Sequence, residues 1–177
     1  MQNGFIFAET KNLKSMNYPV LFGVALVPLI LGSIWYNPKV LGNAWMESSG
    51  VSMPDEKPSM GEMMKIFIPV YIFSLLFATI LMSLSVHQFG AMGMIGGDEK
   101  ASNILPSYAA FMADYGQAFR TFKHGALHGF LGGLFMSLFL IGTTALFERK
   151  SWKYIMIHVG FYVLCGIIMG GLICAFI

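Results

Sequence analysis

Four long stretches of the sequence contain no charged residue, and this spacing restricts the fold more than any other feature. Asp, Glu, Lys and Arg are absent from residues 15–38, 66–97, 124–147 and 154–177. Each stretch is longer than the run of about 20 apolar residues that an α-helix needs to cross the hydrocarbon core of a membrane. Lipid offers no water to satisfy an open strand edge, so such segments are expected to be helical. The sequence therefore predicts an all-α polytopic membrane protein with four transmembrane helices in a bundle.

The predicted helices form a single transmembrane domain, residues 1–177, whose first 15 residues are a polar leader. Pro28 falls in the middle of the first helix, where its missing amide hydrogen predicts a kink. The expected helices cover about residues 17–36, 66–87, 124–147 and 154–177.

The loop over residues 88–123 contains a further helical pattern. After Pro106 the apolar residues recur at positions that share one helix face: Tyr108, Phe111, Met112, Tyr115 and Phe119. This spacing predicts a short amphipathic helix. We expect it to lie on the membrane surface or to cap the bundle, rather than to act as a lid over a binding site.

Four crossings place both termini on one side of the membrane. The opposite side, with the loop over residues 37–64, the adjoining Lys65 and the turn over residues 148–153, carries six of the eleven Lys and Arg residues. Because basic loops are retained in the cytoplasm, this small excess favours non-cytoplasmic termini. Aromatic residues near the predicted helix ends are interpreted as interfacial anchors, namely Trp35, Tyr36, Trp45 and Trp152.

Glycines repeat every four residues on the last two predicted helices. They are Gly125, Gly129 and Gly133 on the third helix and Gly166 and Gly170 on the fourth. Small residues at this spacing let helix backbones approach closely in lipid. The pattern is consistent with packing of the third helix on the fourth, or with contact to another copy or a partner subunit. Either interpretation indicates association rather than catalysis.

Three histidines are predicted to converge on the side of the membrane that holds the termini. His87 ends the second helix, and His124 and His128 lie four residues apart at the start of the third. Imidazoles ligate metals and titrate near neutral pH, which allows a divalent metal site, bis-histidine haem ligation, or a proton or solute path. The alternative is a structural one, in which the histidines lie at headgroup depth and are satisfied by water or backbone carbonyls.

The remaining polar features do not favour catalysis. His158, Tyr162 and Cys165 follow one another along the fourth helix and are interpreted as structural. No carboxylate lies within a predicted span, which disfavours an ion pump, and we find no pair of nucleophile and base. The net charge is +2 with no basic tract, so nucleic acid is not an expected partner.

Several segments resemble the domain of unknown function 1761 family, in the version common in Bacteroidetes-type bacteria. They are LGSIWYNP (residues 31–38), LGNAWM (41–46), FRTFKHGALHG (119–129) and ALFERKSWKY (145–154). The resemblance runs from the first predicted helix to near the end of the chain. It implies a small bacterial inner-membrane protein with four helices, and it implies no established activity.

These observations predict a non-enzymatic accessory or scaffolding protein that associates with itself or with another membrane protein through its glycine-rich helices. The expected partners are the lipid bilayer and either further copies or a larger membrane complex. No cofactor is expected. The alternative is a small transporter or ligand-binding bundle in which His87, His124 and His128 form a haem, divalent metal or proton site.

Overall fold

The structure is a computed structural model that describes residues 17–52, 56–98 and 105–177. Every regular element in these ranges is helical, as predicted. The predicted polar leader, residues 1–15, lies outside the described residues. In chain order the elements are α1 (Val20–Val24), α2 (Val27–Trp35), the π-helical turn η1 (Pro38–Gly42), α3 (Asn43–Ser49), α4 (Met60–Ser85), α5 (Gln88–Met94), α6 (Pro106–Tyr115), α7 (Phe122–Ser137), the π-helical turn η2 (Leu138–Gly142), α8 (Thr143–Phe147) and α9 (Trp152–Phe176).

Three helical spans among the described residues are long and apolar enough to cross a membrane. They are α4, the span Phe122–Phe147 that comprises α7, η2 and α8, and α9. A fourth results if Val20–Trp35 and Pro38–Ser49, which are bent by 57° at their break, are counted together. The predicted second, third and fourth helices therefore correspond to single spans, whereas the predicted first helix is broken.

Two prolines account for the broken first span. Pro28 lies at the start of α2 and has no amide hydrogen to donate to the carbonyl of Val24, where α1 ends. The kink predicted at this proline is observed as a two-residue break between α1 and α2. Pro38 then begins η1, where the Asn37 side chain accepts a hydrogen bond from the amide of Lys39. The chain thus enters a second helical segment in a new direction.

The start of α4 lies six residues before the predicted position because a cap extends the helix. The Ser59 hydroxyl accepts a hydrogen bond from the amide of Glu62, and the Glu62 carboxylate accepts one from the amide of Ser59. This capping box stabilises a first helical turn that contains the charged residue Glu62. The prediction relied on the charge-free run and therefore left this turn out. At the other end, Val86 has an extended backbone and the unpredicted helix α5 follows directly.

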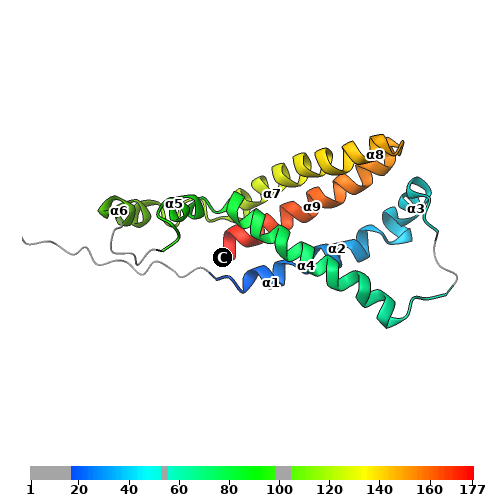
Figure 1. The fold of residues 1–177 in the computed structure, drawn as a ribbon, viewed down its shortest axis with the longest axis horizontal. Helices are drawn as coiled ribbons and strands as arrows, with labels where there is room; N and C mark the ends of the chain where they lie inside the picture. The colour runs from blue at the N-terminus through cyan, green and yellow to red at the C-terminus, as the bar shows by residue number, and fades with distance from the viewer. Residues whose placement is uncertain (1–16, 53–55, 99–104) are drawn as a thin grey trace, which may run out of the picture.

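The centre of the bundle is α9. Half of its most apolar window is buried, compared with 17% for α4 and 22% for Phe122–Phe147. The α9 side chains of Ile155, Met169 and Ile173 are completely covered, and α1, α2, α4 and α7 all pack against this helix. In Figure 1, α4 and α9 run along the long axis of the molecule in one direction, and α1–α2 and α7–α8 run in the other.

The helix predicted after Pro106 is present as α6, although it ends four residues before Phe119. Met112 is buried, whereas Phe111 and Tyr115 on the same face are exposed. In Figure 1, α5 and α6 lie beyond the end of the bundle where α7 begins. The helix and its amphipathic sequence are therefore observed, and its position at a membrane surface remains a prediction.

The connection between α6 and α7 is attached to the end of α9. Phe119 has a positive φ of 61°, which turns the chain toward α7. The guanidinium of Arg120 then donates hydrogen bonds to the backbone carbonyls of Cys174 and Ile177. Carbonyls at a helix C-terminus lack partners within the helix, so a cation there is favourable.

Candidate functional site

The first ligand of the candidate site, His87, lies at the junction between two helices. It follows Val86, whose side chain is fully buried, and it precedes the first residue of α5. The extended backbone of Val86 interrupts the helix at this point. This interruption places the imidazole at the end of α4 with an exposed ring.

The other two histidines lie on the first two turns of α7. Thr121 caps this helix, because its hydroxyl accepts a hydrogen bond from the amide of His124 at 3.3 Å. His128 follows one turn later on the same face. Both side chains are half-buried, so α7 presents two imidazoles toward the end of α4.

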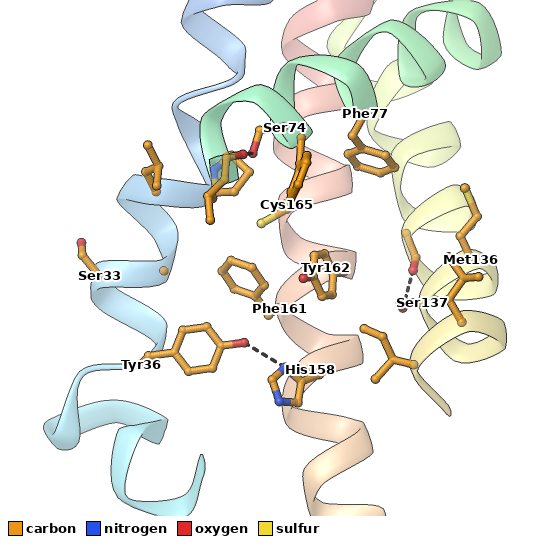
Figure 2. A pocket seen from close by; sticks show the side chains of 18 of the residues that line it. Ser33, Tyr36, Ser74, Phe77, Met136, Ser137, His158, Phe161, Tyr162 and Cys165 are labelled. Atoms are coloured by element: carbon orange, nitrogen blue, oxygen red, sulfur yellow. Dashed lines mark hydrogen bonds between the residues drawn. The ribbon is translucent and has the colours of Figure 1, made fainter. Parts of the chain in front are cut away.

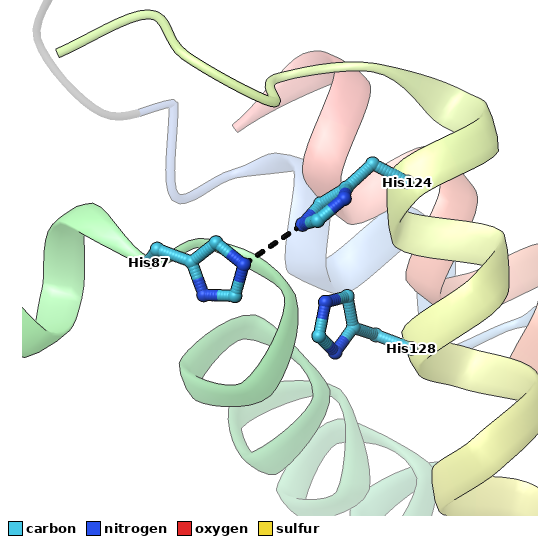
Figure 3. A group of neighbouring side chains, drawn as sticks. All are labelled: His87, His124 and His128. Carbon is cyan, nitrogen blue, oxygen red and sulfur yellow. Dashed lines mark hydrogen bonds between the residues drawn. The ribbon is translucent and has the colours of Figure 1, made fainter. Parts of the chain in front are cut away.

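The structure brings the three predicted histidines together (Figure 3). Their candidate ligand nitrogens all lie within 4.8 Å of one another. The Nε2 atoms of His87 and His124 are 2.9 Å apart, and the centroid of the His128 ring lies 4.5 Å from that of His124 and 5.0 Å from that of His87. Phe119 stacks on the His124 ring at 5.1 Å and covers one side of the group.

This spacing is close to what one metal ion requires. Imidazole nitrogens bind zinc at about 2.0–2.1 Å, so two of them in a tetrahedral site lie about 3.3 Å apart. Among the described residues the group contains no carboxylate or thiolate. An all-imidazole set of three suits borderline divalent metals and leaves a coordination position open.

The predicted packing glycines face one another inside the chain. A Cβ atom at Gly125 would lie 2.8 Å from the carbonyl carbon of Gly170, and one at Gly129 would lie 2.5 Å from that of Gly166. A Cβ at Gly133 would meet the Tyr162 carbonyl oxygen at 2.8 Å. The backbones of α7 and α9 are therefore in direct contact, and these five glycines are buried between the two helices.

Two of the four predicted aromatic anchors make specific contacts with α9. The Trp35 indole donates a hydrogen bond to the carbonyl of Ile157 at 3.2 Å, and the Tyr36 hydroxyl lies 3.2 Å from Nδ1 of His158. Trp45 packs on the Tyr36 ring at 5.3 Å. Trp152 is 65% exposed. Protein contacts thus hold Trp35 and Tyr36, and of the four only Trp152 is largely exposed, as an interfacial anchor would be.

The contact between Tyr36 and His158 was not predicted, and it borders a pocket that was not predicted either. Both residues lie at the same predicted membrane side, one at the end of the first helix and one at the start of the fourth. That shared depth was the available signal. Its weakness is that depth alone does not tell which helix faces are in contact.

Comparison with known proteins supplies a family but no function. No curated protein matches the chain, and no solved structure matches it. Residues 19–174 match the family described as a protein of unknown function, DUF1761. This range covers every element described above except the final residues of α9. The family predicted from the sequence is therefore confirmed: the chain is a member of the DUF1761 family.

Proposed function

We propose that this protein is a non-enzymatic membrane protein that binds a divalent transition-metal ion through His87, His124 and His128. The observation that carries the proposal is the convergence of the three imidazoles from two helices, with ligand nitrogens within 4.8 Å of one another. Within the group, the Nε2 atoms of His87 and His124 lie 2.9 Å apart, within hydrogen-bond distance, and the His128 ring packs against both other rings.

The chemistry of the ligands favours an ion over haem and over a hard cation. Bis-histidine haem ligation needs two imidazoles on opposite faces of a macrocycle, whereas these rings contact one another at centroid distances of 4.5–5.0 Å. Mg²⁺ and Ca²⁺ require oxygen ligands. Zinc, copper, nickel and cobalt accept imidazole nitrogen. Since no neighbouring carboxylate is available as a general base within the described group, binding rather than catalysis is the proposed role.

The proposed setting is the bacterial inner membrane, with the bent pair formed by α1–α2 and η1–α3 as the fourth span. Apolar side chains exposed on the surface of the bundle support contact with lipid, such as Phe135 at 62% exposure and Phe139 at 71%. An accessory or scaffolding role, in an oligomer or a larger complex, remains a prediction. It would require a surface other than the five glycines, because they are buried between α7 and α9.

The proposal is tested by titrating Co²⁺ and Zn²⁺ into chelator-treated protein in detergent. We expect one Co²⁺ per chain with the visible absorption bands of a low-symmetry nitrogen site, displaced by Zn²⁺. His128→Ala should weaken binding at least about 100-fold, since removal of one ligand leaves only two imidazoles. His158→Gln, which changes the only histidine outside the group, is the matched control and should bind as the wild type does.

Equal Co²⁺ affinity in the His128→Ala protein and the wild type would contradict the proposal. Loss of the bands in both variants would also contradict it, because binding would then not depend on this group. Circular dichroism of each variant establishes that the helical content is unchanged before the titrations are compared.

A further inference from the structure

A large pocket lies within the bundle (Figure 2), and none of its lining residues belongs to the histidine cluster. It has a volume of about 890 Å³ and is bordered by α2, α4, α7, η2 and α9. Its wall contains several aromatic side chains, among them Tyr36, Trp45, Phe77, Phe161 and Tyr162, and no charged residue. Pockets for small molecules typically have about 300–1,000 Å³ and a mainly apolar lining with few polar groups.

The polar groups of the pocket differ in what they offer a ligand. The hydroxyls of Ser74 and Ser137 donate to carbonyls of their own helices, those of Val70 and Gly133. In contrast, the Tyr162 hydroxyl makes no hydrogen bond with any described residue, and the Tyr162 side chain is 42% exposed, so the hydroxyl is accessible. This phenol is therefore a free donor on the wall of an apolar pocket.

The pair formed by Tyr36 and His158 supplies a second polar feature. Nδ1 of His158 is engaged by the Tyr36 hydroxyl, whereas its Nε2 is buried and has no hydrogen-bond partner among the described residues. Buried polar atoms without partners are uncommon and carry a free-energy cost. In Figure 2 the pair spans from α2 to α9 at one end of the pocket.

The pocket and the histidine cluster share no residue, and along α4 the side chains of Leu81 and Leu84 come between the last lining residue, Phe77, and His87. Gly132 lines the pocket and lies one turn beyond His128 on α7. A Cβ atom at Gly132 would contact the tips of Leu84 and Leu81 at 3.7 and 3.8 Å. These two residues belong to the last turns of α4, just before the cluster. The pocket is thus a separate feature, and its role does not depend on metal binding.

We propose that the pocket binds one neutral, ring-bearing lipophilic molecule whose carbonyl or hydroxyl oxygen accepts a hydrogen bond from Tyr162. Neutrality follows from the absence of any charged side chain in the lining, since a buried charge without a partner is strongly unfavourable. The aromatic wall favours a flat ring, which stacks on or packs edge-to-face against such side chains. An acyl chain would fill the volume but would leave the phenol without a partner.

The probe for this proposal is decylubiquinone, which combines a benzoquinone ring, carbonyl oxygens and an aliphatic tail. Quinones quench tryptophan fluorescence, and Trp45 on the pocket wall serves as the reporter. We expect saturable quenching of the wild-type protein in lipid nanodiscs. Decanol, which has a similar tail without the ring, should compete at least about tenfold less well, because it offers no ring to the aromatic wall.

Two variants with a matched control locate the binding. Gly132→Leu adds a side chain on the pocket wall without a backbone clash, and it should weaken decylubiquinone binding at least about tenfold by occupying the volume. Gly23→Leu makes the same change on α1, where nothing lies within 4 Å of the added Cβ, and should bind as the wild type does. Tyr162→Phe removes only the free hydroxyl and should weaken binding about fivefold.

The results that would overturn the proposal are specific. Quenching that rises linearly without saturation would show partition into lipid only. Equal affinity for wild type and Gly132→Leu, or equal competition by decanol and decylubiquinone, would exclude a ring-binding site in this pocket. If Gly132→Leu fails to fold by circular dichroism, Tyr162→Phe decides, because unchanged affinity in that variant contradicts the assigned hydrogen bond.

Discussion

The contact between α7 and α9 makes a strong prediction for Gly129→Ala. The added Cβ would lie 2.5 Å from the carbonyl carbon of Gly166 and 3.1 Å from the amide nitrogen of Ile167. Ordinary van der Waals contact begins at 3.4 Å, so the two backbones must separate by roughly an ångström. Overpacking of this kind typically costs about 1–3 kcal/mol, and rigid backbone on both sides places this site toward the upper end. A loss of about 2–3 kcal/mol lowers the melting temperature by about 5–10 °C.

The matched control lies three residues away on the same helix. At Gly132 an added Cβ meets only the flexible tips of Leu84 and Leu81 at ordinary contact distance. Gly132→Ala should therefore leave the melting temperature within about 3 °C of the wild type. Thermal unfolding of both variants in one detergent, followed by circular dichroism, makes the comparison. Equal melting temperatures for Gly129→Ala and the wild type would refute the direct backbone contact of α7 and α9.

Three further predictions concern other contacts. Arg120→Ala removes the donor to the carbonyls of Cys174 and Ile177 and should lower the free energy of unfolding by about 1–2 kcal/mol. The measurement is the melting temperature, and an unchanged melting temperature would show that this contact is not stabilising. Ser59→Ala removes the capping box of α4 and should speed hydrogen exchange of the amides of Glu62 and Met63, which donate to Ser59, about fivefold, while exchange in the middle of α4 stays unchanged. Ligating imidazoles must be neutral, so protons compete with Co²⁺ for them. The Co²⁺ affinity should therefore fall at least about tenfold as the pH is lowered from about 7.5 to about 5.5. An affinity independent of pH would argue against histidine ligands.

The main helices were predictable because charge is the strongest signal in a chain of this kind. Charge-free runs located the spans that became α4, Phe122–Phe147 and α9. The meeting of His87 with His124 and His128 also followed from the sequence, because successive antiparallel spans place the end of one helix beside the start of the next. The regular spacing of Gly125, Gly129 and Gly133 likewise indicated which face of the third helix approaches another backbone.

Other features depend on tertiary contacts that no local pattern encodes. A proline in a helix predicts a kink, but whether the chain bends smoothly or breaks, as it does before Pro28, depends on the surrounding helices. The early start of α4 required the reciprocal cap formed by Ser59 and Glu62. The pocket required knowledge of the rotation of α2 about its axis, because a one-residue rotation would turn Tyr36 away from His158.

X-ray absorption of the zinc-loaded protein decides most directly whether the three imidazoles bind one metal ion. After loading with one equivalent of Zn²⁺, we expect three histidine nitrogens around the zinc at about 2.0–2.1 Å, with the outer-shell scattering that imidazole rings produce. His128→Ala should reduce that count to two. Oxygen atoms alone around the zinc, or three imidazoles retained in the His128→Ala protein, would contradict metal binding by His87, His124 and His128.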